Sequence, residues 1–296
     1  MQPQFAGDAV GVRFFMPSPA LAPYVSTYYL TEVSVPAGTM IEDYLHPEWG
    51  NLRFARNDSW RAAIGAQPLR IAPRFIASGP SSHCSHFVTG TTRIWGIGIL
   101  PLGWARFFDA PASDYADDFV DAAADPVFTG LAGLPDQAFA DAPDPAAEAR
   151  RIDTFLLDYL ATRPAHAEEA RIRAAHGALI DLDVAAVTDL AARIGTSPRS
   201  LERLSLRAFG FSPKLLLRRQ RFLRSLAQFM LDPSLTWIST LDWQYVDQAH
   251  FVRDFKRFMG MSPSAYAALD HPVLRAAARA RLAAAGEAVQ ALHRPG

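Results

Sequence analysis

Residues 245–266 have the sequence YVDQAHFVRDFKRFMGMSPSAY, which combines a helix start, an apolar stripe and a helix stop. Asp247 is a suitable N-cap, because its side-chain oxygen can accept a hydrogen bond from a free backbone N–H of the first turn. Gly260 permits the left-handed conformation that commonly ends a helix. Three phenylalanines recur at steps of four and three residues and therefore share one face: Phe251, Phe255 and Phe258. The stretch predicts a capped amphipathic helix with one exposed face.

The exposed face of this helix has the chemistry of a DNA-reading surface. Gln and Arg side chains can each form bidentate contacts with a base edge, and a lysine one turn further along can contact phosphate. A shorter helix over 235–242 and a turn over 243–246 precede it, which predicts a helix-turn-helix. The predicted base-reading residues are Gln248, Ala249, Val252 and Arg253, and the predicted phosphate contact is Lys256.

The same plan occurs earlier, in residues 187–213. A short helix is followed by Gly195, and Ser197 and Pro198 then supply an N-cap and a suitable first helical residue. The second helix buries leucines on one face and exposes charged residues on the other. The predicted base-reading residues of this unit are Arg199, Glu202 and Arg203, and Ser197 is a predicted phosphate contact.

A continuous helix over 212–231 joins the two units. Its 20 residues span about 30 Å, close to the roughly 34 Å between successive major grooves on one face of DNA. The helix therefore has the length to place two reading helices in adjacent grooves. The predicted phosphate contacts on it are Lys214, Arg218, Arg219, Arg221 and Arg224.

Three motifs within about 171–269 carry a resemblance to a known family. They are GTSPRSLERL (195–204), the Gly210-Phe211-Ser212-Pro213 step and the 245–266 string quoted above. The stretch resembles the DNA-binding domain of AraC/XylS-type transcription regulators. The resemblance implies double-stranded DNA as a partner and the same base-reading positions as the helix faces. It also implies a small effector bound in the N-terminal part, and leaves RNA polymerase and a second copy of the chain open as further partners.

The second unit departs from the family pattern at its turn. Gln244 stands where a glycine is usual, and Thr240 replaces a small residue four positions earlier. A glutamine in the left-handed conformation costs about 1–2 kcal/mol. We therefore expect a strained turn and a second helix slightly displaced from the usual geometry.

The first half of the chain predicts strands. Short runs rich in Val, Ile, Thr and aromatic residues, broken by Pro and Gly, cover about 10–100, and an amphipathic helix follows at about 146–163. We expect an α+β protein with a cupin-like β-barrel or sandwich and an all-α C-terminal domain. The expected units are a sensor or dimerisation domain (1–168), a DNA-binding domain (169–270) and a helical tail (271–296). The helix at 146–163 either mediates dimerisation, which we favour, or covers the barrel.

The N-terminal part also supplies candidate effector residues. HPEWGNLRF (46–54) and the run over 79–108 are similar to an uncharacterised variety of sensor domain, which names no ligand. Strand aromatics are more often core than ligand contacts. The candidate effector residues are His46, Trp49, Arg53, Arg93 and Trp95.

Metal-dependent chemistry is the main alternative. His83, Cys84 and His86 are potential zinc ligands, but side chains alternate along a strand and no fourth ligand is evident. We expect no metal, no cofactor and no catalytic residue, since no nucleophile turn is visible either. The alternative is a cupin-type metal-dependent enzyme fused to a DNA-binding domain. A third interpretation is a helical domain that binds protein instead of DNA.

Charge and composition agree with a two-part cytoplasmic protein. Residues 171–296 hold 18 basic and 10 acidic side chains, whereas residues 1–170 hold 11 and 20, which favours an anionic partner for the C-terminal part alone. The single cysteine fits a reducing compartment. The most apolar stretch, 94–108, is interrupted by Gly, Pro and Arg, so we expect no membrane span and no secretory signal.

Overall fold

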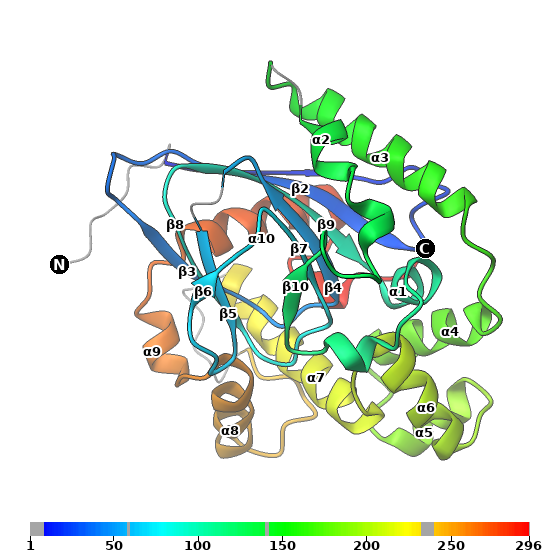
Figure 1. The fold of residues 1–296 in the computed structure, drawn as a ribbon. Helices are drawn as coiled ribbons and strands as arrows, with labels where there is room; N and C mark the ends of the chain where they lie inside the picture. The colour runs from blue at the N-terminus through cyan, green and yellow to red at the C-terminus, as the bar shows by residue number, and fades with distance from the viewer. Residues whose placement is uncertain (1–8, 58–59, 140–141, 232–239, 296) are drawn as a thin grey trace.

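Two antiparallel sheets form the N-terminal part in the computed structural model, which describes residues 9–57, 60–139, 142–231 and 240–295 (Figure 1). The larger sheet holds, in spatial order, β1 (Val10–Phe15), β2 (Val25–Val33), β9 (Thr92–Ile99), β4 (Gly50–Ala55), β7 (Phe75–Ser78) and β10 (Phe119–Asp121). The smaller sheet holds β3 (Ile41–Leu45), β8 (Ser85–Thr89), β5 (Trp60–Ile64) and β6 (Arg70–Ile71). The predicted strand-rich region and the α+β class are confirmed.

The sheets share an apolar core that explains the sequence pattern. β4 is buried along its whole length because it lies inside the larger sheet, paired on both sides with β7 and β9. One of its faces meets α1 (Pro101–Phe107), where a Cβ at Gly50 would lie 2.9 Å from the Trp104 ring. The core on the side of the smaller sheet includes Trp60, Phe87 and Ile94.

Helices form the rest of the chain. After α1 come α2 (Leu134–Ala138) and α3 (Pro145–Ala161), with short 3-10 turns at η1 (Ala112–Tyr115) and η2 (Thr129–Leu131). The C-terminal helices are α4 (Glu169–Ile180), α5 (Val187–Arg193), α6 (Pro198–Phe209), α7 (Pro213–Leu231), α8 (Gln248–Met259), α9 (Pro263–Ala267) and α10 (Pro272–Ala285), followed by η3 (Gln290–Leu292). In Figure 1, α7 runs below the sheets, with α5 and α6 near one end and α8 and α9 near the other. No helix of the described residues is both long and apolar enough to span a bilayer.

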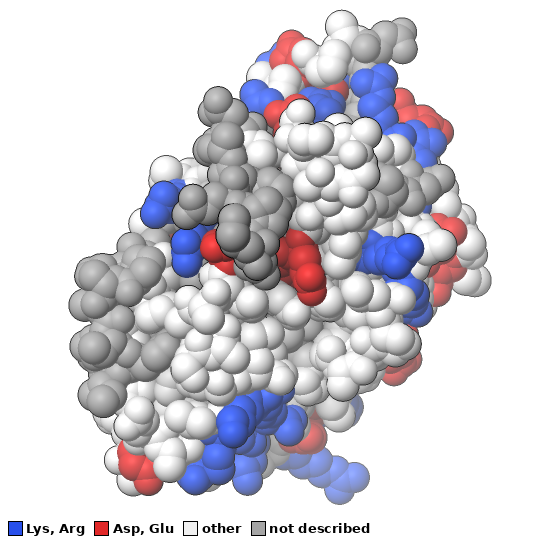
Figure 2. Space-filling view, turned by 90° about the vertical axis from the view of Figure 1, so that its left-hand side faces the viewer, with Lys and Arg blue, Asp and Glu red and all other residues white. Residues whose placement is uncertain are grey.

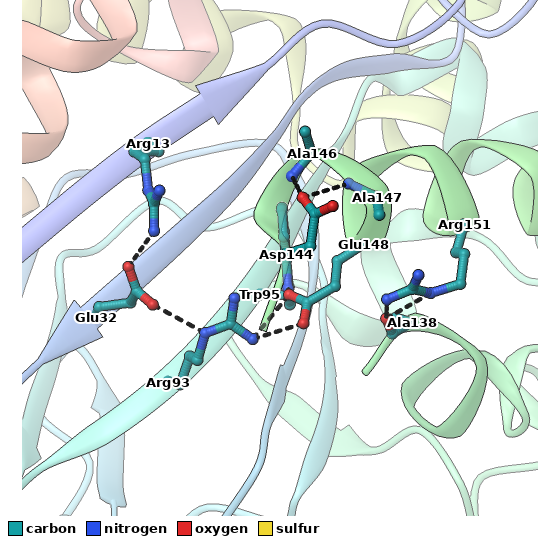
Figure 3. Close-up of polar contacts among 10 residues, drawn as sticks. All are labelled: Arg13, Glu32, Arg93, Trp95, Ala138, Asp144, Ala146, Ala147, Glu148 and Arg151. Atoms are coloured by element: carbon teal, nitrogen blue, oxygen red, sulfur yellow. Dashed lines mark hydrogen bonds and ion pairs between the residues drawn. The ribbon is translucent and has the colours of Figure 1, made fainter. Parts of the chain in front are cut away.

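α3, the helix expected at 146–163, covers the larger sheet with one face. Asp144 caps it by accepting hydrogen bonds from the backbone N–H groups of Ala146 and Ala147 (Figure 3). Glu148 is fully buried and accepts hydrogen bonds from Trp95 Nε1 at 2.7 Å and from Arg93 at 2.8 Å. A buried carboxylate with two donors fixes the helix to the sheet, because removing Arg93 would leave its charge uncompensated and removing Trp95 would take away one of its hydrogen bonds. Dimerisation through α3 stays a prediction.

The C-terminal tail packs on the N-terminal sheets. α10 contacts β1 and β3, and Asp43 of β3 accepts hydrogen bonds from the backbone N–H groups of Val273 and Leu274 at 2.9 and 2.8 Å. His271, just before the helix, adopts a positive φ of 46° and bonds the same carboxylate at 2.9 Å. The helical tail expected at 271–296 is therefore a structural part of the N-terminal layer.

Candidate nucleic-acid interface

The first helix-turn-helix unit consists of α5, a turn and α6. Gly195 has a φ of +63°, and the Ser197 hydroxyl accepts a hydrogen bond from the Ser200 backbone N–H at 3.2 Å. Gly210 closes α6 in the left-handed conformation, with a φ of 81°. Leu201 and Leu204 are buried on the inner face. The predicted base-reading residues lie on the outer face and are all exposed: Arg199, Glu202 and Arg203.

The second unit repeats these features around α8. Asp247 caps the helix by accepting a hydrogen bond from the His250 backbone N–H at 2.6 Å, and Gly260 ends it with a φ of 69°. The three stripe phenylalanines are fully buried. Gln248, Ala249 and Arg253 are exposed, and Val252 is half-buried. Most of the first helix predicted at 235–242 lies outside the described residues, and residues 240–242 are not helical.

The turn at Gln244 does not have the expected strain. Asp117 and His271 are the non-glycine residues with positive φ in the described ranges, so Gln244 is not left-handed. Its backbone N–H donates to Asp242 Oδ1 at 2.9 Å, and its side-chain Nε2 donates to the Leu182 carbonyl at 2.8 Å. The expectation of a left-handed turn is therefore wrong, because the chain turns through an Asp side-chain contact that glutamine tolerates.

The arginines of α7 mostly contact protein. Arg218 and Arg221 both pair with the fully buried carboxylate of Asp254 in α8, at 2.5 and 3.2 Å. Arg224 pairs with Asp242 before the second turn. These pairs hold α8 and its turn against α7, and each compensates a buried charge. The predicted phosphate contacts that are exposed are Ser197, Lys214 and Lys256.

Arg219 lies inside the protein, so its prediction as a phosphate contact does not hold in this conformation. The side chain is fully buried, and its guanidinium lies 4.0 Å from the centre of the Trp49 ring. Its Nη1 donates to the carbonyls of Ser81 at 2.8 Å and Glu48 at 3.2 Å. Burial lowers the pKa of Arg219 to about 9, so the side chain is still a cation at neutral pH. The central helix of the C-terminal part is thus anchored in the N-terminal part.

The N-terminal part also contacts the end of α8. The Cys84 backbone N–H donates to the Phe258 carbonyl at 2.7 Å, and its thiol donates to the Met259 carbonyl at 3.2 Å. Burial raises the pKa of this thiol to about 12, which disfavours the thiolate. His83 and His86 instead contact Asp117 and Glu42. Across the described ranges, no group of three His, Cys, Asp or Glu is placed to hold a metal ion.

A cavity of about 140 Å³ lies between the two sheets and α10. Two of the five candidate effector residues, His46 and Arg53, line it. Trp49 instead stacks on Arg219, and Arg93 and Trp95 bond Glu148, so these three do not line the cavity. Sequence reasoning missed the contribution of α10. Its cavity-lining residues follow helical spacing, which is the pattern that identifies them: Val273, Leu274, Ala277, Ala278 and Arg281.

Hydrogen bonds connect the cavity wall to the C-terminal helices. His46 Nε2 lies 2.7 Å from the hydroxyl of Tyr266 in α9, and both side chains are buried. Burial, with the nearby His271 as a second cause, lowers the pKa of His46 to about 3, so the ring is neutral. Gln220 of α7 donates to the Ala291 carbonyl of η3 at 2.6 Å. The cavity wall is thus hydrogen-bonded to α9, and η3 beside it is hydrogen-bonded to α7.

The candidate reading faces are available to an anionic partner. Within the described part of the chain, Arg199, Arg203 and Arg253 form no ion pair or hydrogen bond through their side chains. Figure 2 shows basic side chains gathered at the foot of the molecule, where Figure 1 places α8. Unpaired exposed cations on a capped helix are suited to phosphate and guanine contacts.

Comparison with known protein families supports the helix-turn-helix geometry in the C-terminal part of the chain. Residues 190–268, which include α6 and α8, match the family described as a helix-turn-helix domain. No curated protein matches the chain. Among solved structures, ToxT from Vibrio cholerae has 10% identity and a TM-score of 0.45, covering 81% of this chain and 97% of that chain. ToxT from the same organism with an unsaturated fatty acid bound has 9% identity and a TM-score of 0.43, covering 78% and 95%. The AraC-like transcriptional activator CuxR has 14% identity and a TM-score of 0.23, covering 74% and 88%.

Replacing Gln244 with Gly should lower stability. Glycine adds backbone freedom to the unfolded chain and removes the bond to Leu182, so we expect a loss of about 1–2 kcal/mol in urea denaturation. Gln244→Ala, which removes the bond without adding this freedom, should lose less. A gain in stability with glycine would show that the turn is strained after all.

Acidification should destabilise the fold through His46. The folded pKa of about 3 lies below the unfolded value of about 6.5, so between these values the unfolded state binds more protons. Stability therefore falls as the pH drops from 7 towards 4, and the contribution of His46 at pH 5 is about 2 kcal/mol. Denaturation of His46→Gln at pH 7 and at pH 5 should show that this variant loses less stability between the two pH values than the wild type does. If the stability of His46→Gln depended on pH as strongly as that of the wild type, His46 would be protonated in the folded protein.

Proposed function

We propose that this chain is a DNA-binding regulator of the AraC type and that it inserts α6 and α8 into adjacent major grooves. The match of residues 190–268 to a helix-turn-helix domain supports this proposal. Arg199, Glu202 and Arg203 would contact bases from α6. The corresponding residues of α8 are Gln248, Ala249, Val252 and Arg253. The observation that supports this best is the repetition of one plan, a capped helix with a buried stripe and an unpaired polar face, at both ends of α7.

Phosphate contacts come from the exposed residues around these helices. Ser197 and Lys214 flank α6, and Lys256 lies on α8. Arg218, Arg221 and Arg224 keep the second unit against α7 through their aspartate pairs, and their guanidinium groups are secondary candidates because they are partly exposed. A helix of 19 residues spans about 28 Å, a length that matches neighbouring grooves.

The N-terminal part would act as the sensor. Its loops contact α7 through Arg219 and α8 through Cys84, so their position sets how both units are presented. A small effector in the cavity would shift these contacts through His46. In this assignment residues 1–168 sense, 169–270 bind DNA and 271–296 close the cavity, and the protein acts in the cytoplasm with its DNA. RNA polymerase and a second copy of the chain are the partners such a regulator would use.

DNA-binding variants test the assignment of roles. On DNA selected from a random pool by the wild type, Arg203→Ala should lose about 1–3 kcal/mol and relax specificity at one base pair, with little loss on random DNA. Lys214→Ala should weaken binding to selected and to random DNA alike. It should also reduce the slope of log affinity against log salt concentration by about 0.9. Arg279→Ala, an exposed arginine on α10, is the control.

Equal losses on selected and random DNA would remove Arg203 from base recognition. Unaltered DNA binding by both variants would remove Arg203 and Lys214 from the DNA contacts, whereas failure of the wild type to select any DNA would favour a helical domain that binds protein. Both measurements use equilibrium titrations at several salt concentrations, since DNA affinities depend strongly on salt.

A further inference from the structure

Arg281 is a buried cation with an unused hydrogen-bonding edge. It comes from α10, lines the cavity and is 4% exposed. Its Nη1 donates to Thr27 Oγ1 at 2.7 Å, whereas its Nε and Nη2 have no hydrogen-bond partner among the described residues. Nε and Nη2 form one side of the guanidinium plane, so the two free donors point in the same direction. This is the geometry in which arginine binds a carboxylate with two parallel hydrogen bonds.

The other charged and amide side chains of the cavity wall already have partners, whereas the indole N–H of Trp60 has none among the described residues. Arg53 forms an ion pair with Glu48, and Glu48 also accepts a hydrogen bond from Asn51 at 3.0 Å. Asn51 in turn accepts from the Tyr29 hydroxyl at 2.9 Å. His46 is neutral and bonded to Tyr266. Among the described residues of the wall, Arg281 is thus the cation without an ion-pair partner, and burying it in this state is costly unless an anion compensates it.

The rest of the wall is apolar and its size limits the ligand. Aromatic and aliphatic side chains from both sheets and α10 line it: Trp60, Ile64, Ile76, Phe87, Phe119 and Leu274. The volume of about 140 Å³ is similar to that of an engineered apolar cavity of about 150 Å³ that binds benzene. A long acyl chain or a nucleotide exceeds this volume.

We propose that the cavity binds a small monocarboxylate with a compact apolar body, and that Arg281 holds its carboxylate through Nε and Nη2. The inference rests on the proposed function, because it names the chemical class of the effector. The C-terminal tail is then part of the sensor, since α10 supplies the anion-binding residue. The anion compensates a charge that has no ion-pair partner among the described residues and is otherwise close to the Phe14 ring, 5.6 Å from its guanidinium carbon.

Cyclohexanecarboxylate and its neutral amide, cyclohexanecarboxamide, are suitable probes because they have nearly the same shape. Calorimetric titration and thermal denaturation of the full chain without DNA should show that the acid binds at least tenfold more tightly than the amide, about 1.4 kcal/mol. Arg281→Met should abolish this preference without lowering the melting temperature of the unliganded protein. Arg281→Lys, which keeps the charge but not the two-donor edge, should retain part of the preference for the acid. Arg279→Met, the control, should retain all of this preference.

Equal binding of acid and amide, no binding of either, or a preference that survives in Arg281→Met would overturn the proposal. A strongly destabilised Arg281→Met would also overturn it, because the guanidinium would then serve the fold. Since these titrations contain no DNA, their failure is distinct from a failure to bind DNA.

Discussion

The buried guanidinium of Arg219 is the interaction on which the arrangement of the two parts depends. It projects from the middle of α7, stacks on Trp49 and donates to two carbonyls of the loops before β4 and β8. A cation without a carboxylate partner is stable in the interior only where carbonyl dipoles and an aromatic face replace water. These loops cannot move away from α7 without leaving the cation uncompensated. The helix that joins the two DNA-binding units is therefore held by the N-terminal part.

The same loops connect this anchor to the cavity. His46 and Trp49 are three residues apart, and the first bonds Tyr266 of α9 while the second stacks on Arg219 of α7. In the smaller sheet, Asp43 of β3 caps α10, and Cys84, just before β8, contacts the end of α8. A ligand that changes the spacing between the sheets and α10 would therefore act on α7 itself and on α8 and α9 near one of its ends. Such coupling requires different contacts in two states, and the effector would select between them.

The features that could be predicted from the sequence are those decided by neighbouring residues. Ser197 and Asp247 as caps, glycines 210 and 260 as helix ends and the phenylalanine stripe of α8 all act within a few turns of chain, and the structure has each of them. The partners of the α7 arginines depend on contacts between segments far apart in sequence. No local pattern distinguishes Arg219, which is buried, from Arg218, which is partly exposed. Trp95 and Arg93 were candidate effector residues, but both bond Glu148 of α3, a contact with a distant segment that no local pattern predicts. The role of Arg281 could not be predicted because it depends on the packing of α10 against strands more than 200 residues earlier in the chain.

Hydroxyl-radical footprinting can show whether both units contact one DNA molecule. The wild-type chain would be bound to fragments that it selects from a random pool in low salt. We expect two protected patches on one face of the duplex, with centres about 10–10.5 base pairs apart. A failure to select any fragment, or a single protected patch, would contradict this expectation.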